Sequence, residues 1–159
     1  MTTTNRMSRL FFVALILVLS LALMGANVYD GTVHPGVHQL KAKLSGKAEA
    51  PGPGDPDGKG QAEITLKMEG HQVCWEIEVK KILLPAAAAH IHLGSQGVPG
   101  PVVVALSAPN AKGVSKGCTV VDHELHMNLH MHPEQYYVNV HNSAFPAGAV
   151  RGQLRLNED

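Results

Sequence analysis

The sequence predicts an all-β domain, an antiparallel Greek-key sandwich or barrel of about seven strands with one short helix near residues 122–131. Apolar and polar residues alternate in several short runs, and turn signals rich in Gly and Pro separate these runs roughly every 8–12 residues. The 159 residues include 16 Gly and 10 Pro, and only 16% are charged. This composition favours a turn-rich β domain over a helical one.

The first half of the domain contains a strand followed by a hairpin. Residues 38–46 alternate, which is the pattern of a half-buried strand, with an apolar face made by Leu40, Ala42 and Leu44. Residues 50–60 are rich in Pro and Gly and predict a loop. Residues 61–68 and 71–80 alternate again on either side of a short turn, so we expect an antiparallel hairpin.

Two histidines lie on the next predicted strand, in the sequence AHIHLG (89–94). Alternation turns the apolar residues of this run, Leu93 included, toward the core, and it turns His90 and His92 outward. A Gly/Pro turn, SQGVPGP, then leads into a short apolar strand at 101–106.

The one predicted helix lies within residues 118–135, after a polar stretch at 110–117 that we interpret as a loop. Asp122 can cap the start of this helix, and Pro133 ends it. The helix carries four histidines within HELHMNLHMH (123–132), and we expect them to lie on a solvated helix face. The alternative is an adventitious affinity of this segment for metal ions.

The final pair of predicted strands covers 136–141 and 149–156, joined by the loop NSAFPAG. In the first of them, alternation turns Tyr137, Asn139 and His141 away from the core. With these strands the pattern is that of a Greek-key domain, either immunoglobulin-like or superoxide-dismutase-like.

The N-terminus predicts export from the cytoplasm. Arg6 and Arg9 precede an uncharged apolar run, Leu10–Met24, and the small residues that follow it end at Ala26. We interpret residues 1–26 as a signal peptide, with an uncleaved N-terminal anchor as the alternative because Met24 is large for a cleavage site. In either case the remainder would be secreted, periplasmic or held at the cell surface.

The mature chain is predicted to be a flexible N-terminus, 27–36, followed by one domain, 37–157. Its formal net charge is near zero, so the charge balance does not suggest nucleic acid or an anionic membrane as a partner. Membrane contact is expected only through an uncleaved N-terminal segment. The remaining class of partner is an extracellular protein or surface.

Cys74 and Cys118 are the two cysteines of the chain. An even count in an exported chain predicts a disulfide. Closing a loop of about 45 residues corresponds to about 4 kcal/mol of stabilisation in the chain-entropy model. The alternative, two reduced thiols acting as metal ligands, is disfavoured by their wide separation and by an oxidising compartment.

Two stretches resemble the CHRD family, a domain first described in chordin and also found in exported bacterial proteins. They are AAHIHLGSQGVPGPVVVAL (88–106) and YYVNVHNSAFPAGAVRGQL (136–154). The family pattern has an H-I-H-x-G start, a G-P-V-V strand, a Y-V-N-V-H strand and a P-x-G-x-x-R-G-Q-L ending. The resemblance covers roughly 37–156 and implies an all-β domain, with little implied about activity. The cysteine pair also resembles that of bacterial members.

Three histidines, His90, His92 and His141, are candidate metal ligands. They point away from the apolar core on two strands, and they converge if those strands are neighbours. Three imidazole nitrogens suit zinc, and copper accepts the same ligands. An H-x-H strand followed by a later V-H strand is also similar in layout to copper–zinc superoxide dismutases, which hold copper on the outside of a Greek-key barrel. That family's bridging histidine and zinc loop have no clear counterpart here.

The alternative is that these imidazoles make hydrogen bonds that join adjacent strands. Four further motif residues are expected to serve the fold: Asn139, Arg151, Gly152 and Gln153. We expect Arg151 to brace the sheet by hydrogen bonds to neighbouring carbonyls or to Asn139.

No G-x-S-x-G nucleophile motif, phosphate-binding loop or catalytic carboxylate pair stands out in the sequence. Two hypotheses follow. The sequence favours a non-catalytic extracytoplasmic structural or partner-binding module. The second hypothesis is a copper- or zinc-binding domain that uses His90, His92 and His141.

Overall fold

The structure is a computed structural model that describes residues 37–157. The predicted signal peptide or anchor, 1–26, and the predicted flexible N-terminus, 27–36, lie outside the described residues. Within the described part, no helix combines the length and the apolar character needed to cross a membrane.

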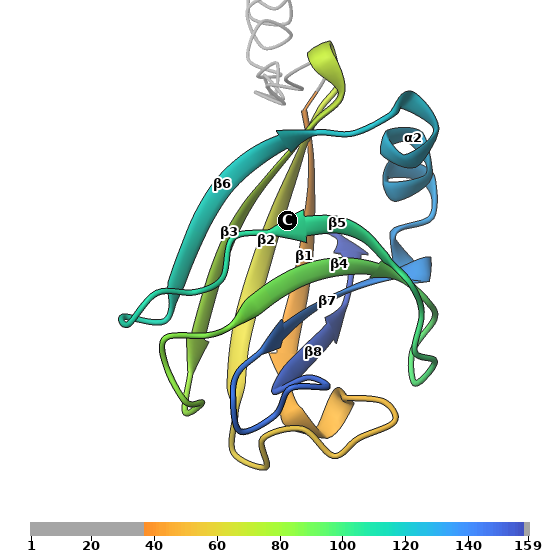
Figure 1. The fold of residues 1–159 in the computed structure, drawn as a ribbon. Coiled ribbons are helices and arrows are strands. Elements are labelled where there is room, and N and C mark those ends of the chain that lie inside the picture. The colour runs from red at the N-terminus through yellow and green to blue at the C-terminus, as the bar shows by residue number, and fades with distance from the viewer. Residues whose placement is uncertain (1–36, 158–159) are drawn as a thin grey trace, which may run out of the picture. The chain divides into compact units, whose positions relative to one another are not determined.

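The described chain forms nine strands, one α-helix and three short 3-10 helices. The strands are β1 (Val37–Ser45), β2 (Lys59–Lys67), β3 (Gln72–Lys80), β4 (Ala88–Leu93), β5 (Val102–Leu106), β6 (Val114–Val120), β7 (Tyr136–His141), β8 (Val150–Gln153) and β9 (Arg155–Leu156). The helices are η1 (Gly46–Ala48), η2 (Glu69–His71), α2 (His123–Met131) and η3 (Pro133–Gln135). The helix α2 follows β6 and leads into β7 (Figure 1).

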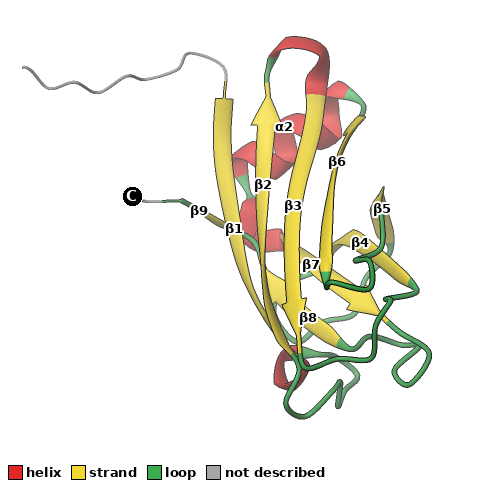
Figure 2. Ribbon diagram, turned by 90° about the vertical axis from the view of Figure 1, so that its left-hand side faces the viewer, coloured by secondary structure: helices red, strands yellow, loops and turns green. Residues whose placement is uncertain are grey.

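All strand pairs are antiparallel, in the order β5-β4-β7-β8-β1-β2-β3-β6, and β9 pairs with β1. Figure 2 shows β1, β2, β3 and β6 side by side as one layer, and β4, β5, β7 and β8 as the other. The layers curl into a nearly closed barrel. A hydrogen bond links its two edge strands, because the Ser115 hydroxyl on β6 donates to the carbonyl oxygen of Ser107, just after β5, at 2.6 Å. The predicted all-β fold class is therefore confirmed.

The core follows the predicted alternation. On β1, Leu40, Ala42 and Leu44 are buried, and the hairpin β2–β3 presents its own alternating apolar residues to the same interior. One exception is Leu93, which we expected to face inward; it is exposed because β4 ends at this residue.

The prediction of about seven strands is wrong, because one strand was missed and one predicted strand is two. The strand β6 includes residues that we interpreted as a polar loop, and its first half carries few apolar side chains. Gly117 explains this pattern, since a Cβ here would lie 2.4 Å from a ring carbon of Trp75. The indole of Trp75 occupies this space, and its Nε1 donates to the Ser115 hydroxyl at 3.0 Å. The predicted strand 149–156 is also divided, at Leu154, into β8 and β9.

The predicted helix near 122–131 is confirmed as α2. The Asp122 carboxylate accepts a hydrogen bond from the backbone N–H of Leu125 at 2.8 Å and caps the helix start. The helix ends at Met131, two residues before Pro133.

Cys74 and Cys118 lie directly opposite each other on β3 and β6, and their sulfur atoms are bonded. The structure therefore pairs them as a disulfide, as the sequence predicts. This bond joins β6, the edge strand of its layer, to the neighbouring β3.

Candidate metal centre

The family motifs meet on one face of the strands β4, β7 and β8. In the register of these strands, His90 lies opposite Asn139 and His92 lies opposite Tyr137. The β8 strand extends both rows across the sheet, giving His90–Asn139–Arg151 and His92–Tyr137–Gln153. Motifs far apart in the sequence therefore form a single continuous surface on the outside of the barrel.

His141 completes a group of three imidazoles. It lies two residues beyond Asn139 on β7 and is therefore the diagonal neighbour of His90. One ring nitrogen from each of His90, His92 and His141 lies within 4.8 Å of the others. The closest pair is His90 Nδ1 and His141 Nε2, which are 3.2 Å apart. The predicted convergence of the three histidines is present in the structure.

Backbone carbonyls orient two of the three rings. His92 Nδ1 donates to the carbonyl oxygen of Gly100 at 2.8 Å, and His141 Nδ1 donates to that of Pro146 at 3.0 Å. In each neutral ring the proton then resides on Nδ1, so Nε2 carries a lone pair. This arrangement is typical of metal-binding histidines, whose second nitrogen donates to a carbonyl or carboxylate.

His92 is held by packing as well as by hydrogen bonding. Its ring stacks on Tyr137 with centroids 4.8 Å apart and an interplanar angle of 7°. Its Nε2 is buried without a hydrogen-bond partner. The pairing of β4 with β5 shifts register between Ile91 and His92, and such irregularities often re-aim a side chain. The stack therefore fixes a ring whose unprotonated nitrogen has no partner.

Asn139 borders the same group. Its Oδ1 lies 3.0 Å from His141 Nε2, the nitrogen that also contacts His90. The Nδ1 protons of His92 and His141 already go to carbonyls outside the group. Several electron-pair donors therefore face one another across a small space, and a cation placed there would be stabilised.

A loop, 94–101, covers the outer face of β7 and β8, and Arg151 anchors it. Arg151 Nη2 donates to the carbonyl oxygens of Ser95 at 2.9 Å and Val98 at 3.0 Å. The guanidinium carbon also lies 3.4 Å from the centroid of the Tyr137 ring. Gly100, whose carbonyl orients His92, belongs to the same loop. Arg151 thus holds the covering loop through its carbonyls and indirectly supports the orientation of His92.

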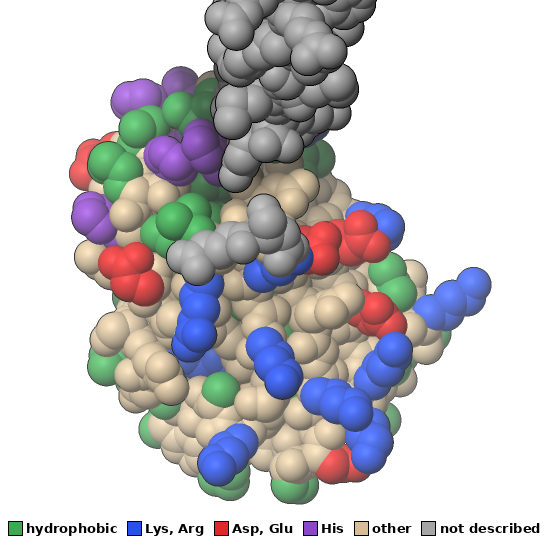
Figure 3. Space-filling model, turned by 180° about the vertical axis from the view of Figure 1, so that it is seen from behind, with side chains coloured by type: hydrophobic (Ala, Val, Ile, Leu, Met, Phe, Trp, Pro, Cys, Tyr) green, Lys and Arg blue, Asp and Glu red, His purple; other side chains and the backbone are tan. Residues whose placement is uncertain are grey.

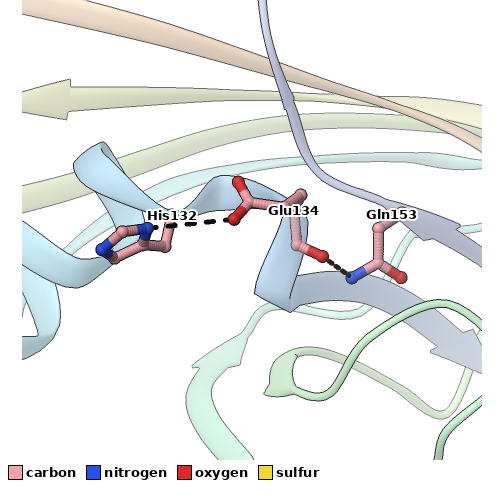
Figure 4. A network of polar contacts seen from close by, with 3 residues as sticks. All are labelled: His132, Glu134 and Gln153. Carbon is pink, nitrogen blue, oxygen red and sulfur yellow. Dashed lines mark hydrogen bonds and ion pairs between the residues drawn. The ribbon is translucent and has the colours of Figure 1, made fainter.

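Gln153 contacts the backbone of three residues that surround the end of β8. Its Nε2 lies 2.8 Å from the carbonyl oxygens of Gly94, Glu134 and Tyr136. Figure 4 shows the contact with the Glu134 backbone, together with the approach of the Glu134 carboxylate to His132. The amide therefore connects β8 to the start of the covering loop and to η3.

Burial favours the neutral form of two site histidines, His90 and His141. Desolvation lowers the pKa of His90, and His141 and then His92 lower it further. Desolvation also lowers the pKa of His141, as does His92, against an opposing effect of the hydrogen bond to Pro146. Metal ligation requires neutral imidazole, so these rings are in the ligand form at neutral pH.

The covering loop explains why side chains on the outward face of the barrel are buried. Tyr137 and Asn139 lie on the outward face, as alternation predicts, yet each is only 3% exposed. Arg151 is 1% exposed for the same reason. The sequence predicts only a turn for the SQGVPGP segment and does not indicate its part in orienting His92. Tyr137 and Pro146 were also missed as supports of the histidines, since stacking and carbonyl contacts have no sequence signature.

The four histidines of 123–132 do not all lie on a solvated face. His126 is fully buried, which corrects the sequence interpretation of this helix. The reason is tertiary: the face that carries His126 packs against the β2–β3 turn, where the His71 ring centroid lies 5.6 Å away.

Glu49 is a half-buried residue near this region that the sequence does not single out, and its Oε1 atom is buried. Burial raises its pKa to about 7, despite the opposing charge of Arg151 and a hydrogen bond from the Ala50 backbone. Its carboxylate lies against Gly148, where an added Cβ would come within 2.5 Å. Gly148 follows the segment that supplies the Pro146 carbonyl to His141, so Glu49 packs beside a support of the histidine group.

We expect the stability of the wild-type domain to fall relative to Glu49→Gln as the pH rises from about 4.5 to about 7. The pKa of Glu49 is raised in the folded state, so the folded protein binds more protons than the unfolded chain across this interval. The difference should be constant above this interval. Urea denaturation of both proteins between about pH 4.5 and 8 measures it. Parallel pH profiles of the two proteins would contradict a raised pKa of Glu49 in the folded state.

Comparison with protein families gives one result that bears on identity: the model of the CHRD domain matches residues 40–154. The chain belongs to the CHRD domain family. The match spans β1 to the end of β8, and so includes both rows of motif residues and His141. Comparisons with curated proteins and with solved structures find no match. The family motifs of this CHRD domain therefore coincide with the histidine group and with the residues that orient it.

Proposed function

We propose that this CHRD domain is an extracytoplasmic binding module that holds one copper or zinc ion through His90, His92 and His141. One observation carries the proposal. Backbone carbonyls take the Nδ1 protons of His92 and His141, so that both Nε2 atoms carry lone pairs; that of His92 has no partner, and that of His141 lies 3.2 Å from His90 Nδ1. The sequence alone favoured a module without metal, and this geometry favours the metal-binding hypothesis.

The spacing of the nitrogens supports a transition metal. Ligands about 2.0–2.1 Å from a tetrahedral zinc ion are about 3.3 Å apart. The separation of 3.2 Å between His90 Nδ1 and His141 Nε2 is close to this value. The widest separation in the group, up to 4.8 Å, requires a small closing movement of the side chains. Neutral imidazoles favour zinc or copper over calcium or magnesium.

The proposed role is binding without catalysis. Three protein ligands leave a coordination position for water or for a donor atom of another molecule. His90 and His141 are only partly buried, whereas His92 is 8% exposed, so the approach to the ion is from the side of His90 and His141. An extracellular protein or surface partner could reach the ion there. Support for export comes from the cysteine pair and from the basic and apolar N-terminal sequence.

A metal titration tests the proposal. The full chain is purified without an affinity tag, loaded with copper or zinc and dialysed, and the bound metal is counted. We expect the double variant His90→Ala/His92→Phe to bind one ion fewer than the wild type, because two ligands are lost. Phe at position 92 keeps the stacking on Tyr137, so the fold should survive.

The control is His132→Ala, which removes an exposed histidine whose contact is with Glu134 at 3.9 Å. This variant should bind as much metal as the wild type. Equal metal contents in the wild type and the double variant would contradict the proposal. If the double variant were less stable in the absence of metal and equal in metal content, the histidines would instead serve to join β4 and β7 through the His90–His141 hydrogen bond.

A further inference from the structure

A cleft of about 410 Å³ lies on the outside of the barrel where β8 and β9 meet β1. Figure 3 shows Lys and Arg side chains gathered on one face of the molecule in that view. Four cations line the cleft: Lys41 and Lys43 of β1, Arg151 of β8 and Arg155 of β9. No carboxylate of the described residues lines it, and neither does any histidine of the proposed metal centre. The cleft is therefore a separate site with a positive charge.

Gly152, a residue of the family motif, allows β8 to approach β1 closely. A Cβ at position 152 would lie 2.3 Å from the carbonyl oxygen of Lys43. Such a contact is too close for any side chain, so only Gly allows the two backbones to lie this near each other. The motif thereby brings Arg151 and Gln153 of β8 beside the lysines of β1.

The strand register places two of the cations directly opposite each other. Lys41 on β1 pairs with Arg155 on β9, and Glu63 on β2 lies opposite Lys41 on its other side. Like charges that face each other across paired strands repel. An anion bound between β1 and β9 would reduce this repulsion, so the arrangement favours an anionic ligand.

Two other cations of the cleft are available to such a ligand. Lys43 and Arg155 are exposed, and neither forms an ion pair with a carboxylate of residues 37–157, whereas Lys80 on β3 pairs with Glu78. The cleft volume lies within the range of about 300–1,000 Å³ that is typical of sites for small molecules. The charge and the size together indicate a site for a small anion or for one unit of a polymer.

Arg151 contributes a second, independent observation. It is 1% exposed, and its Nη1 has no hydrogen-bond partner among the described residues. A buried donor without an acceptor costs free energy and calls for an explanation. The carboxylate of Glu49 acts on the charge of Arg151 but does not line the cleft. A carboxylate in the cleft would be an acceptor well suited to a guanidinium group.

Gln153 adds a requirement for a hydrogen-bond donor in the ligand. Its Nε2 is occupied by three backbone carbonyls, and its buried Oε1 has no partner among the described residues. A fully ionised anion offers Oε1 no hydrogen, whereas a hydroxyl group does. Leu156, which is 50% exposed, adds an apolar surface against which the C–H face of a sugar ring can pack.

We propose that this cleft binds a sugar acid, in which a carboxylate is accompanied by several hydroxyl groups. The carboxylate would interact with the cations of β1, β8 and β9, and a hydroxyl group would donate to Gln153. The same chemistry occurs in a free sugar acid and in the uronate units of a polysaccharide. The proposal does not depend on the metal centre, because no residue of that group lines the cleft.

The test is an NMR titration of the ¹⁵N-labelled full chain, without added metal, with galacturonate and with trigalacturonate. We expect saturable shifts of the Gly152 and Leu156 amides. Lys43→Gln/Arg155→Gln should weaken binding about tenfold or more, because two charge-assisted hydrogen bonds are lost. Both side chains are exposed, so the fold should be kept. Tighter binding of the trimer would assign the cleft to a polysaccharide, and equal binding would assign it to a free sugar acid.

Matched controls make the result specific. Lys67→Gln/Lys112→Gln removes the same charge from exposed lysines outside the cleft, and it should bind as the wild type does. Galactose lacks the carboxylate and acetate lacks the hydroxyl groups, so both should bind more weakly than galacturonate. The proposal is overturned if neither acid binds, if galactose or acetate binds as tightly as galacturonate, or if the two double variants have equal affinities.

Discussion

An Arg151→Met variant is expected to lose about 3–5 kcal/mol of its free energy of unfolding. Arg151 is 1% exposed, and its Nη2 satisfies the carbonyl oxygens of Ser95 and Val98. The Met side chain fills much of the space of the buried aliphatic part of Arg151. It cannot donate to the two carbonyls or interact with the charge of Glu49. Removing one partner from a buried polar network is costly because the other members stay desolvated.

Urea or guanidinium denaturation of wild type and variant measures this loss. The control is Arg155→Met on β9, an exposed arginine only four residues along the chain, for which a change of at most about 0.5 kcal/mol is expected. Equal losses in the two variants would show that Arg151 does not brace the covering loop.

The same substitution should also weaken metal binding if the variant remains folded. Arg151 holds the loop whose Gly100 carbonyl accepts the His92 Nδ1 proton. Losing a residue that orients a metal ligand typically reduces the affinity about 10–100-fold. Titration calorimetry with the metal gives this ratio. An unchanged affinity would show that the covering loop does not affect metal binding.

Replacing both cysteines, in Cys74→Ala/Cys118→Ala, is expected to lower the free energy of unfolding by about 2–4 kcal/mol. The bond constrains 44 residues of sequence separation in the unfolded chain and joins the edge strand β6 to β3. Denaturation of the wild type with and without reductant provides the measurement. Reductant should lower the stability of the wild type and leave the variant unchanged.

A chemical test accompanies this prediction. Neither thiol of the oxidised protein should react with an alkylating reagent until reductant is added. Alkylation before reduction, or a double variant as stable as the wild type, would contradict a stabilising disulfide.

The sequence predicts well those features that depend on alternation within one strand. Local periodicity predicts the core residues of β1, the β2–β3 hairpin and the capped start of α2. It also predicts the shared outward direction of His90, His92 and His141. The register between β4, β7 and β8 does not, because pairing of strands remote in the sequence is decided by the whole barrel. The sequence therefore indicates that the three histidines could converge, and the register brings them together.

Other features could not be predicted because their causes are long-range. The strand β6 lacks a clear apolar pattern, since Gly117 makes room for Trp75 of another strand. The burial of Tyr137, Asn139 and Arg151 on the outer face depends on the covering loop 94–101. His126 is buried because α2 packs on a turn some 55 residues earlier in the sequence, at His71.

The most direct test of the proposed metal centre is X-ray diffraction from crystals grown with copper, with data collected on both sides of the copper absorption edge. We expect an anomalous peak bounded by His90, His92 and His141, with nitrogen ligands about 2.0–2.1 Å from the ion. His92 Nδ1 and His141 Nδ1 should still donate to the Gly100 and Pro146 carbonyls. Crystals with copper bound elsewhere and none between these three histidines would contradict the account.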